Sequence, residues 1–367
     1  MQPVLELSNV SVSFDTPFGE VEAVRDVSWS LNSGEVLAIV GESGCGKTVM
    51  VQSVMKLLPK NSRLKSGTIT VDGEDISNYK ERQMRKLRSS VFSMVSQDPM
   101  TSLNPTIPIG KQMIEAIKKH QKISTADAKT KALELMRMVE IDDVEERFKL
   151  QPHYFSGGMR QRCVLAMALA SEPKIIFADE PTTALDVTVQ AKILKLIRDL
   201  KERTGISFVF ISHDLGVVAG VADRVAIMYA GKIVEIGTVE EVFYDPRHPY
   251  TWGLLSALPS LSCDGKMLRS IPGAPPTMID LPKGDAFAVR NSFAMKIDYE
   301  EMPPMFQVTD THYAATWLLD ERAPKVDPPV RLHRYTTAAT EELADDLSEQ
   351  TEPQQENLPT EIEGVCP

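Results

Sequence analysis

The chain has 367 residues, of which 43% are hydrophobic, and its 40 basic and 51 acidic residues give it a net charge of -11. The length suits about two domains, and the composition is that of an ordinary globular protein. The acidic balance argues against a protein whose main role is to wrap nucleic acid, because such a protein presents a basic face. No apolar run approaches the roughly 18 residues that cross a bilayer, and the N-terminus lacks the basic start and apolar core of a signal peptide. We therefore expect the chain to stay in the cytoplasm.

The cysteines are scattered along the chain, and no two of them form a C-x-x-C pair. This spacing indicates neither a zinc site nor a disulfide framework, so we expect reduced thiols. The cysteines are Cys45, Cys163, Cys263 and Cys366.

Two segments near the N-terminus alternate apolar and polar residues. Residues 4–14 and 20–31 follow this period of two, which predicts half-buried strands of an antiparallel sheet. Phe14 lies upstream of a glycine-rich loop, at a distance where its ring could stack on a nucleotide base. Two alternatives stay open: Phe14 is a plain core residue, or Phe18 takes the stacking role.

The glycine-rich loop, residues 41–48, has the sequence Gly-Glu-Ser-Gly-Cys-Gly-Lys-Thr and is the most informative motif of the chain. It lies between residues 36–40, an apolar run typical of a buried strand, and residues 49–58, whose apolar residues have helical spacing. The loop matches G-x-x-x-x-G-K-[ST], in which backbone N–H groups and the helix start surround a phosphate chain. We expect Lys47 to reach the β and γ phosphates and Thr48 to offer its hydroxyl to Mg²⁺. The residues assigned to the nucleotide in and beside the loop are Gly41, Ser43, Gly44, Cys45, Gly46, Lys47, Thr48 and Val49.

A block of helical pattern covers about residues 100–172. It predicts helices at 109–119 and 128–139, with a cap at 124–127 before the second. The block ends with a Ser-Gly-Gly segment before the apolar residues 163–170. Because a helix start attracts anions, this segment is a second candidate anion site. Its residues are Ser156, Gly157 and Gly158.

Two acids, Asp179 and Glu180, end a predicted apolar strand that starts at Lys174. Carboxylates at the end of a buried strand lose hydration unless they meet a cation or a reacting water. We expect Asp179 to hold Mg²⁺ through its water shell and Glu180 to polarise the attacking water. The alternative is a pair of ordinary surface acids, but in combination with the phosphate loop the two acids are a much more specific signal.

Polar residues follow two other predicted strands. Residues 91–96 lead to Gln97, and residues 206–211 lead to His213. In an open α/β sheet the carboxyl ends of the strands meet where the ligand binds. We therefore expect His213 to contact the γ-phosphate, although a histidine in this position is usually only a loop residue.

The chain changes character after about residue 245. Frequent prolines predict that residues 245–335 form a loop-rich extension. Residues 336–367 are rich in acids, contain no lysine or arginine, and have few large apolar side chains. Such a composition predicts a disordered tail.

Together these motifs resemble the ATPase subunits of ABC transporters over about residues 4–238. The resemblance implies an α/β P-loop ATPase domain at 1–244, in which a RecA-like core carries an antiparallel β subdomain and an inserted helical subdomain. It also implies a head-to-tail dimer that holds each ATP between one subunit's Walker A loop and the other's signature motif. The residues that carry the resemblance are the phosphate loop, Gln97, Ser156-Gly157-Gly158, Asp179-Glu180, Ala184-Leu185-Asp186 and His213. It implies that Gln97 holds the γ-phosphate, water and Mg²⁺, and that Asp186 belongs to the ATP site.

Three further segments are similar to the oligopeptide/dipeptide and nickel importer subfamily, and within it to D-type oligopeptide permease ATPases. They are residues 97–105, the signature Phe-Ser-Gly-Gly-Met-Arg-Gln-Arg, and Arg-His-Pro-Tyr-Thr at 247–251. The resemblance implies ATP-driven oligopeptide import from the cytoplasmic face of the plasma membrane. The implied partners are an F-type ATPase, two permease subunits and, indirectly, an extracellular peptide-binding protein, with no nucleic acid.

Some members of this subfamily bind an iron-sulfur cluster through cysteines in the C-terminal segment. Here residues 284–291 contain no cysteine, and Cys263 alone cannot supply the four thiolates of a cluster. We predict no iron-sulfur cluster. Three other functions stay open: import of nickel or another small solute, a ribosome-associated ABC ATPase, and a scaffold with an inactive site.

Overall fold

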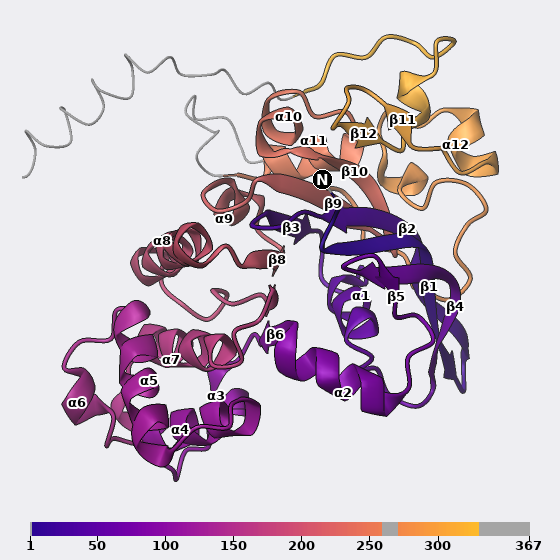
Figure 1. Cartoon of the computed structure of the whole chain (residues 1–367). Helices are drawn as coiled ribbons and strands as arrows, with labels where there is room; N and C mark the ends of the chain where they lie inside the picture. Colours follow the sequence, from indigo (N-terminus) through magenta and orange to yellow (C-terminus); the bar gives the residue numbers. More distant parts are fainter. Residues whose placement is uncertain (1, 259–270, 330–367) are drawn as a thin grey trace, which may run out of the picture. The chain divides into compact units, whose positions relative to one another are not determined.

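The computed structural model describes residues 2–258 and 271–329 (Figure 1). Its first sheet is antiparallel, with the strand order β2-β1-β4-β5. Leu7 of β1 lies opposite Trp29 of β2, and both are buried. The sheet confirms the two predicted N-terminal strands, whose side chains alternate between the core and solvent. Its strands are β1 (Leu5–Thr16), β2 (Gly19–Leu31), β4 (Ser62–Val71) and β5 (Glu74–Asp75).

The second sheet, in the described part of the chain, has the strand order β11-β12-β10-β9-β3-β8-β7-β6. Strands β9, β3, β8, β7 and β6 are parallel to one another, so their carboxyl ends lie at one edge. Every residue of β3, β7 and β8 is buried, as expected of central strands covered on both faces. These strands are β3 (Val36–Val40), β6 (Phe92–Val95), β7 (Ile175–Asp179), β8 (Ser207–Ser212), β9 (Arg224–Tyr229) and β10 (Lys232–Thr238).

Helices α3 to α7 lie between β6 and β7 in the chain, and they gather together (Figure 1). The helices predicted at 109–119 and 128–139 are confirmed as α4 and α5. Ser124 caps α5 as predicted, because its hydroxyl accepts a hydrogen bond from the Asp127 N–H at 3.1 Å. The elements are α1 (Lys47–Val54), α2 (Glu81–Ser90), α3 (Pro99–Ser102), α4 (Ile109–His120), α5 (Thr125–Met138), α6 (Val144–Arg147), η1 (Pro152–Tyr154), α7 (Gly157–Leu169), α8 (Val187–Thr204) and α9 (Leu215–Ala219).

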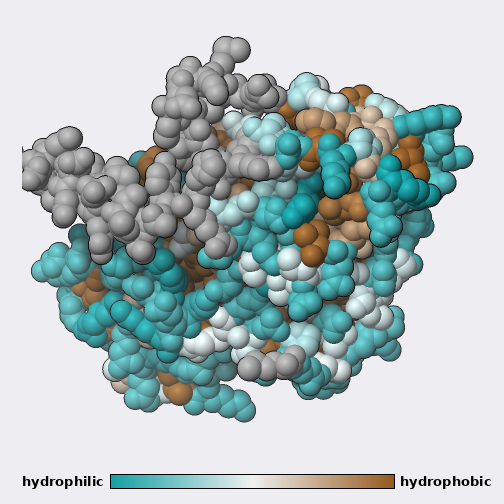
Figure 2. Space-filling view, turned by 90° about the horizontal axis from the view of Figure 1, so that it is seen from above, coloured by the Kyte–Doolittle hydropathy of each residue, from teal (hydrophilic) through white to brown (hydrophobic). Residues whose placement is uncertain are grey.

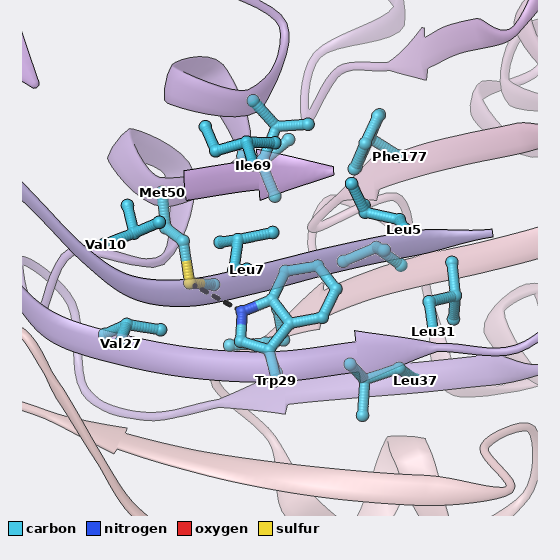
Figure 3. Close-up of a cluster of buried hydrophobic side chains, with 14 of the residues drawn as sticks. Leu5, Leu7, Val10, Val27, Trp29, Leu31, Leu37, Met50, Ile69 and Phe177 are labelled. Atoms are coloured by element: carbon cyan, nitrogen blue, oxygen red, sulfur yellow. Dashed lines mark hydrogen bonds between the residues drawn. The ribbon is translucent and has the colours of Figure 1, made fainter. Parts of the chain in front are cut away.

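A hydrophobic cluster joins the two sheets around α1 (Figure 3). Trp29 lies at its centre and donates its indole N–H to the sulfur of Met50 at 3.2 Å. Leu37 of β3 and Phe177 of β7 belong to the same cluster, so it reaches the strands that lead to the phosphate loop and the acids. This packing fixes α1, and with it the loop that precedes α1.

The chain after β10 continues with short elements. The sequence predicts a loop-rich extension without strands here. In the structure β12 nevertheless pairs with β10 and extends the second sheet, with Glu235 opposite Ala314. The tail at 336–367, Cys263 and Cys366 lie outside the described residues. The elements are α10 (Val239–Tyr244), α11 (Pro249–Ser256), η3 (Ala288–Arg290), α12 (Lys296–Glu300), β11 (Phe306–Gln307), β12 (Tyr313–Ala314) and η4 (Trp317–Leu319).

The surface seen from above carries both hydrophilic and hydrophobic residues (Figure 2). Hydrophobic residues occur there in small groups among hydrophilic ones, as is usual for a protein surface in water. Among the residues that the structure describes, no helix has the length and apolar character needed to span a membrane.

Candidate nucleotide-binding site

The phosphate loop connects the buried strand β3 to α1. Gly46, the residue before α1, has a left-handed φ of 106°. A Cβ atom there would lie 2.2 Å from the carbonyl oxygen of Ala23, so only glycine fits. Likewise, a Cβ atom on Gly41 would lie 2.1 Å from the Met228 carbonyl oxygen. The glycines of the motif therefore allow the loop to pack closely against β2 and β9.

Lys47 begins α1, and its side chain turns back over the loop. Its Nζ atom donates to the carbonyl oxygens of Gly41 at 2.7 Å and Glu42 at 2.9 Å. The residue is buried, so its positive charge is held at the centre of the loop rather than in solvent. This arrangement offers a cation to a phosphate group at the position that the motif predicts.

Thr48 and Asp179 contact each other although they come from different elements. The Thr48 hydroxyl donates to Asp179 Oδ1 at 3.0 Å. Burial raises the pKa of Asp179; the Thr48 hydrogen bond opposes this shift, and the charge of Glu180 adds to it. A buried carboxylate beside a hydroxyl is the oxygen donor set that Mg²⁺ prefers, and a cation would relieve the cost of burying the charge. The two residues therefore fit a Mg²⁺ site.

Glu180 is the meeting point of three side chains from separate segments. Its Oε2 atom accepts hydrogen bonds from Gln97 Nε2 at 3.3 Å and Thr183 Oγ1 at 3.0 Å, and lies 3.2 Å from His213 Nδ1. The backbone of Glu180 has a left-handed φ of 47°, which is uncommon for a residue other than glycine. Because β6, β7 and β8 end at one edge of the sheet, residues far apart in the sequence converge on one carboxylate.

Lys47, Thr48, Glu180 and the three side chains around Glu180 line one cavity of about 820 Å³. Phe14 is part of its wall, whereas Phe18, the alternative for base stacking, is 86% exposed and lies outside it. The residues around the cavity that the sequence predicted are Phe14, Ser43, Gly44, Gly46, Lys47, Thr48, Val49, Gln97, Glu180 and His213. Those that it missed are Val21, Ala23, Glu42, Thr183 and Met278. Thr183 was the easiest of these to find, because its hydroxyl follows Glu180 by three residues.

Seven other predicted residues do not line the cavity, among them Asp179, which contacts the cavity residue Thr48. Cys45 is buried in the hydrophobic cluster, where burial raises the pKa of its thiol, and Gly41 lies against β9. Ser156 and Asp186 cap helices: the Ser156 hydroxyl accepts from the Met159 N–H, and Asp186 Oδ1 accepts from the Val189 N–H.

Gly157 and Gly158 begin α7 beside the start of α8. A Cβ atom on Gly158 would lie 2.3 Å from Val189, and one on Gly157 would lie 3.4 Å from Leu185. Gly158 therefore lets the signature segment pack against the segment that contains Asp186, whereas a Cβ atom on Gly157 would make only an ordinary contact. Ser156 and Gly157 are exposed.

Residues 24–183 match the family described as ABC transporter, and residues 234–297 match the oligopeptide/dipeptide transporter C-terminal region. The chain is 56% identical over 328 residues to the oligopeptide transport ATP-binding protein OppD of Bacillus subtilis (strain 168), covering 89% of this chain and 92% of that protein. The chain belongs to the ABC transporter ATP-binding proteins.

This ABC protein is also similar to a second transport protein and to a solved structure. It is 55% identical to the dipeptide transport ATP-binding protein DppD of Lactococcus lactis subsp. cremoris (strain MG1363), over 89% of this chain and 94% of that protein. Its fold matches the dimeric ATP-binding cassette MJ0796 bound to ADP and Pi, with a TM-score of 0.57 and 26% identity over 64% of this chain and 98% of that one. The predicted P-loop ABC-ATPase fold is confirmed, and ATP is the nucleotide that the family hydrolyses.

Proposed function

We propose that this ABC protein hydrolyses ATP to drive the import of oligopeptides. The observation that carries the proposal is the convergence of Gln97, Thr183 and His213 on Glu180, in the same cavity as Lys47 and Thr48. The C-terminal match to the oligopeptide/dipeptide transporter region, and the printed functions of OppD and DppD, support peptides as the cargo. Nickel is the alternative cargo, and the experiment below distinguishes it from peptides.

The predicted site residues in and beside the cavity have proposed roles. Lys47 binds the β and γ phosphates, and Thr48, Asp179 and Gln97 hold Mg²⁺. When bound, the metal offsets the negative charge on the phosphate oxygens. Glu180 orients the attacking water, and its contacts with Gln97 and His213 keep the carboxylate directed at the cavity. Phe14 contributes to the wall on which the base rests.

The signature residues and Asp186, which lie outside the cavity, act in our proposal on the ATP of an opposed subunit. Ser156 and Gly157 present an exposed helix start, and the buried Gly158 packs against the segment that contains Asp186. The opposed subunit is an F-type ATPase, and the pair docks on two permease subunits at the cytoplasmic face of the plasma membrane. An extracellular binding protein supplies the peptide. The dimeric state of the MJ0796 cassette supports this arrangement.

The domain boundaries and the absence of an iron-sulfur cluster also stay proposals. The ATPase domain is assigned to 1–244, with the helical subdomain at about 100–172, and the extension to 245–335. Among the described residues no group of three or more His, Cys, Asp or Glu side chains could hold a metal ion. Iron analysis of the purified chain tests the prediction about the cluster.

The first experiment measures uptake of labelled oligopeptides and, in parallel, of nickel. Cells carry the native chain, Glu180→Gln, or the matched control Glu300→Gln, whose carboxylate lies on exposed α12. We expect Glu180→Gln to lower peptide uptake by about 10² to 10⁴, the usual contribution of a positioned acid or base. Loss of nickel uptake instead would assign a different cargo. Unchanged uptake of both would contradict the proposed transport function.

A further inference from the structure

Glu42, a variable position of the phosphate loop, is held by residues of the C-terminal extension. Its carboxylate accepts two hydrogen bonds from Arg290, at 2.6 Å from Nη1 and 2.9 Å from Nη2. Its backbone N–H donates to the Tyr250 hydroxyl at 2.9 Å. Glu42 and Arg290 are 248 residues apart in the sequence. The bidentate pairing of guanidinium and carboxylate fixes orientation as well as charge.

Arg290 is itself tightly constrained. Only 6% of its side chain is exposed, and its Nε donates to the Pro272 carbonyl at 2.8 Å. The guanidinium carbon lies 5.7 Å from the centre of the Tyr229 ring, and Tyr229 packs on Tyr250 at 4.7 Å. The hydrogen bonds to Glu42 raise the pKa of Arg290, so the group is always charged. Arg290 therefore cannot follow Glu42 if the loop moves, and instead restrains it.

The position of Glu42 matters to the nucleotide for two reasons. Glu42 lines the cavity together with Lys47, so it forms part of the wall around the proposed phosphate position. Its carbonyl oxygen also accepts a hydrogen bond from Lys47. An unpaired Glu42 carboxylate would repel the triphosphate, and a displaced Glu42 would alter the acceptors that hold the lysine.

We propose that Arg290 is a positioning residue that neutralises and orients Glu42, so that the C-terminal extension sets the affinity of the phosphate loop for ATP. Tyr250 assists by holding the Glu42 backbone. The extension thus acts on the ATP site of its own subunit, without contacting the nucleotide. Any change that separates Arg290 from Glu42 lowers the affinity for ATP.

The test measures binding of a non-hydrolysable ATP analogue with Mg²⁺ to the full-length chain and to Arg290→Met, Glu42→Gln and the double variant. Arg290→Met should weaken binding about tenfold, because one unpaired charge then faces the triphosphate in a partly buried site. Glu42→Gln removes that charge, so the double variant should bind more tightly than Arg290→Met. The effect should be smaller for ADP, which carries less charge.

The matched control is Arg322→Met, since Arg322 pairs with Asp320 on the exposed surface of the same extension. Thermal unfolding of each variant separates binding from stability. If Arg290→Met is too unstable to titrate, Arg290→Lys takes its place, because it keeps the positive charge. Arg290→Lys should bind the ATP analogue more tightly than the double variant Arg290→Lys/Tyr250→Phe. Affinity within twofold of the native chain for Arg290→Met, or a double variant no tighter than Arg290→Met, would overturn the proposal.

Discussion

The position of the Lys47 side chain depends on the neighbouring backbone of the phosphate loop. The sequence motif predicts its role, and the structure places its ammonium group on the carbonyl oxygens of Gly41 and Glu42. A buried ammonium without an acceptor would be costly, so the loop itself keeps the charge in place. Glu180 depends instead on distant partners, because Gln97 and His213 reach it from other strands.

This difference predicts distinct effects of two substitutions. Lys47→Ala removes the cation that meets the phosphates, so the affinity for ATP should fall by at least about tenfold. Glu180→Gln should leave that affinity nearly unchanged while hydrolysis is lost. Titration with the ATP analogue measures the effect, with Lys296→Ala on the exposed end of α12 as the control. Equal affinity for Lys47→Ala and the native chain would contradict the assigned role of the loop.

Strand β10 is the element that connects the ATPase sheet with the extension. Its Glu235 is fully buried, and the carboxylate accepts hydrogen bonds from the N–H groups of Arg247 at 2.7 Å and His248 at 3.0 Å. His312, just before β12, lies 2.8 Å from the same carboxylate. One side chain thus fixes both the start of α11 and the strand that extends the sheet.

Glu235→Ala should therefore destabilise the fold strongly. The change leaves two backbone donors and the His312 ring without their partner, and each buried unpaired group costs about 1 to 3 kcal/mol. We expect the free energy of unfolding to fall by about 3 kcal/mol or more, as measured by chemical denaturation. Glu321→Ala, at an exposed position of the extension, is the matched control. A change as small as that of the control would show that the carboxylate does not hold this junction.

The stability of the whole molecule should depend on pH through Asp285. Burial raises the pKa of this carboxyl to about 6, with a further contribution from Asp298. Its usual value is 3.8, so between pH 3.8 and 6 the folded state binds more protons than the unfolded state. The contribution of Asp285 to the free energy of unfolding therefore decreases as the pH rises through this window and is fully present only below it.

Asp285→Asn removes this titration while keeping an oxygen that can accept the Phe287 N–H. Relative to the native chain, the variant should gain stability as the pH rises from about 4 to 7.5, by up to about 3 kcal/mol from the pKa shift. Thermal and chemical unfolding across this range measure the difference. A difference between the two chains that does not change with pH would contradict the raised pKa.

The sequence by itself determined the features that depend on short-range order. The phosphate loop needs glycines and a lysine at fixed spacing, and apolar runs before Gly41, Asp179 and His213 predict the strands that carry them. The rules for parallel sheets then place those strand ends at one edge. The placement of the loop and of the two acids at one edge of the sheet was therefore predictable, as was the ABC ATPase fold.

Only the tertiary structure decided the contacts made across long separations. The pairing of Arg290 with Glu42 has no periodic signal, because a single surface acid and a single arginine are common in any sequence. Strands β11 and β12 are too short to give an alternating pattern, and β12 is defined by the edge of β10 that it meets. Folding brings these residues together because the extension must satisfy buried polar groups on the ATPase sheet. The sequence around one partner contains no pattern that predicts the other partner.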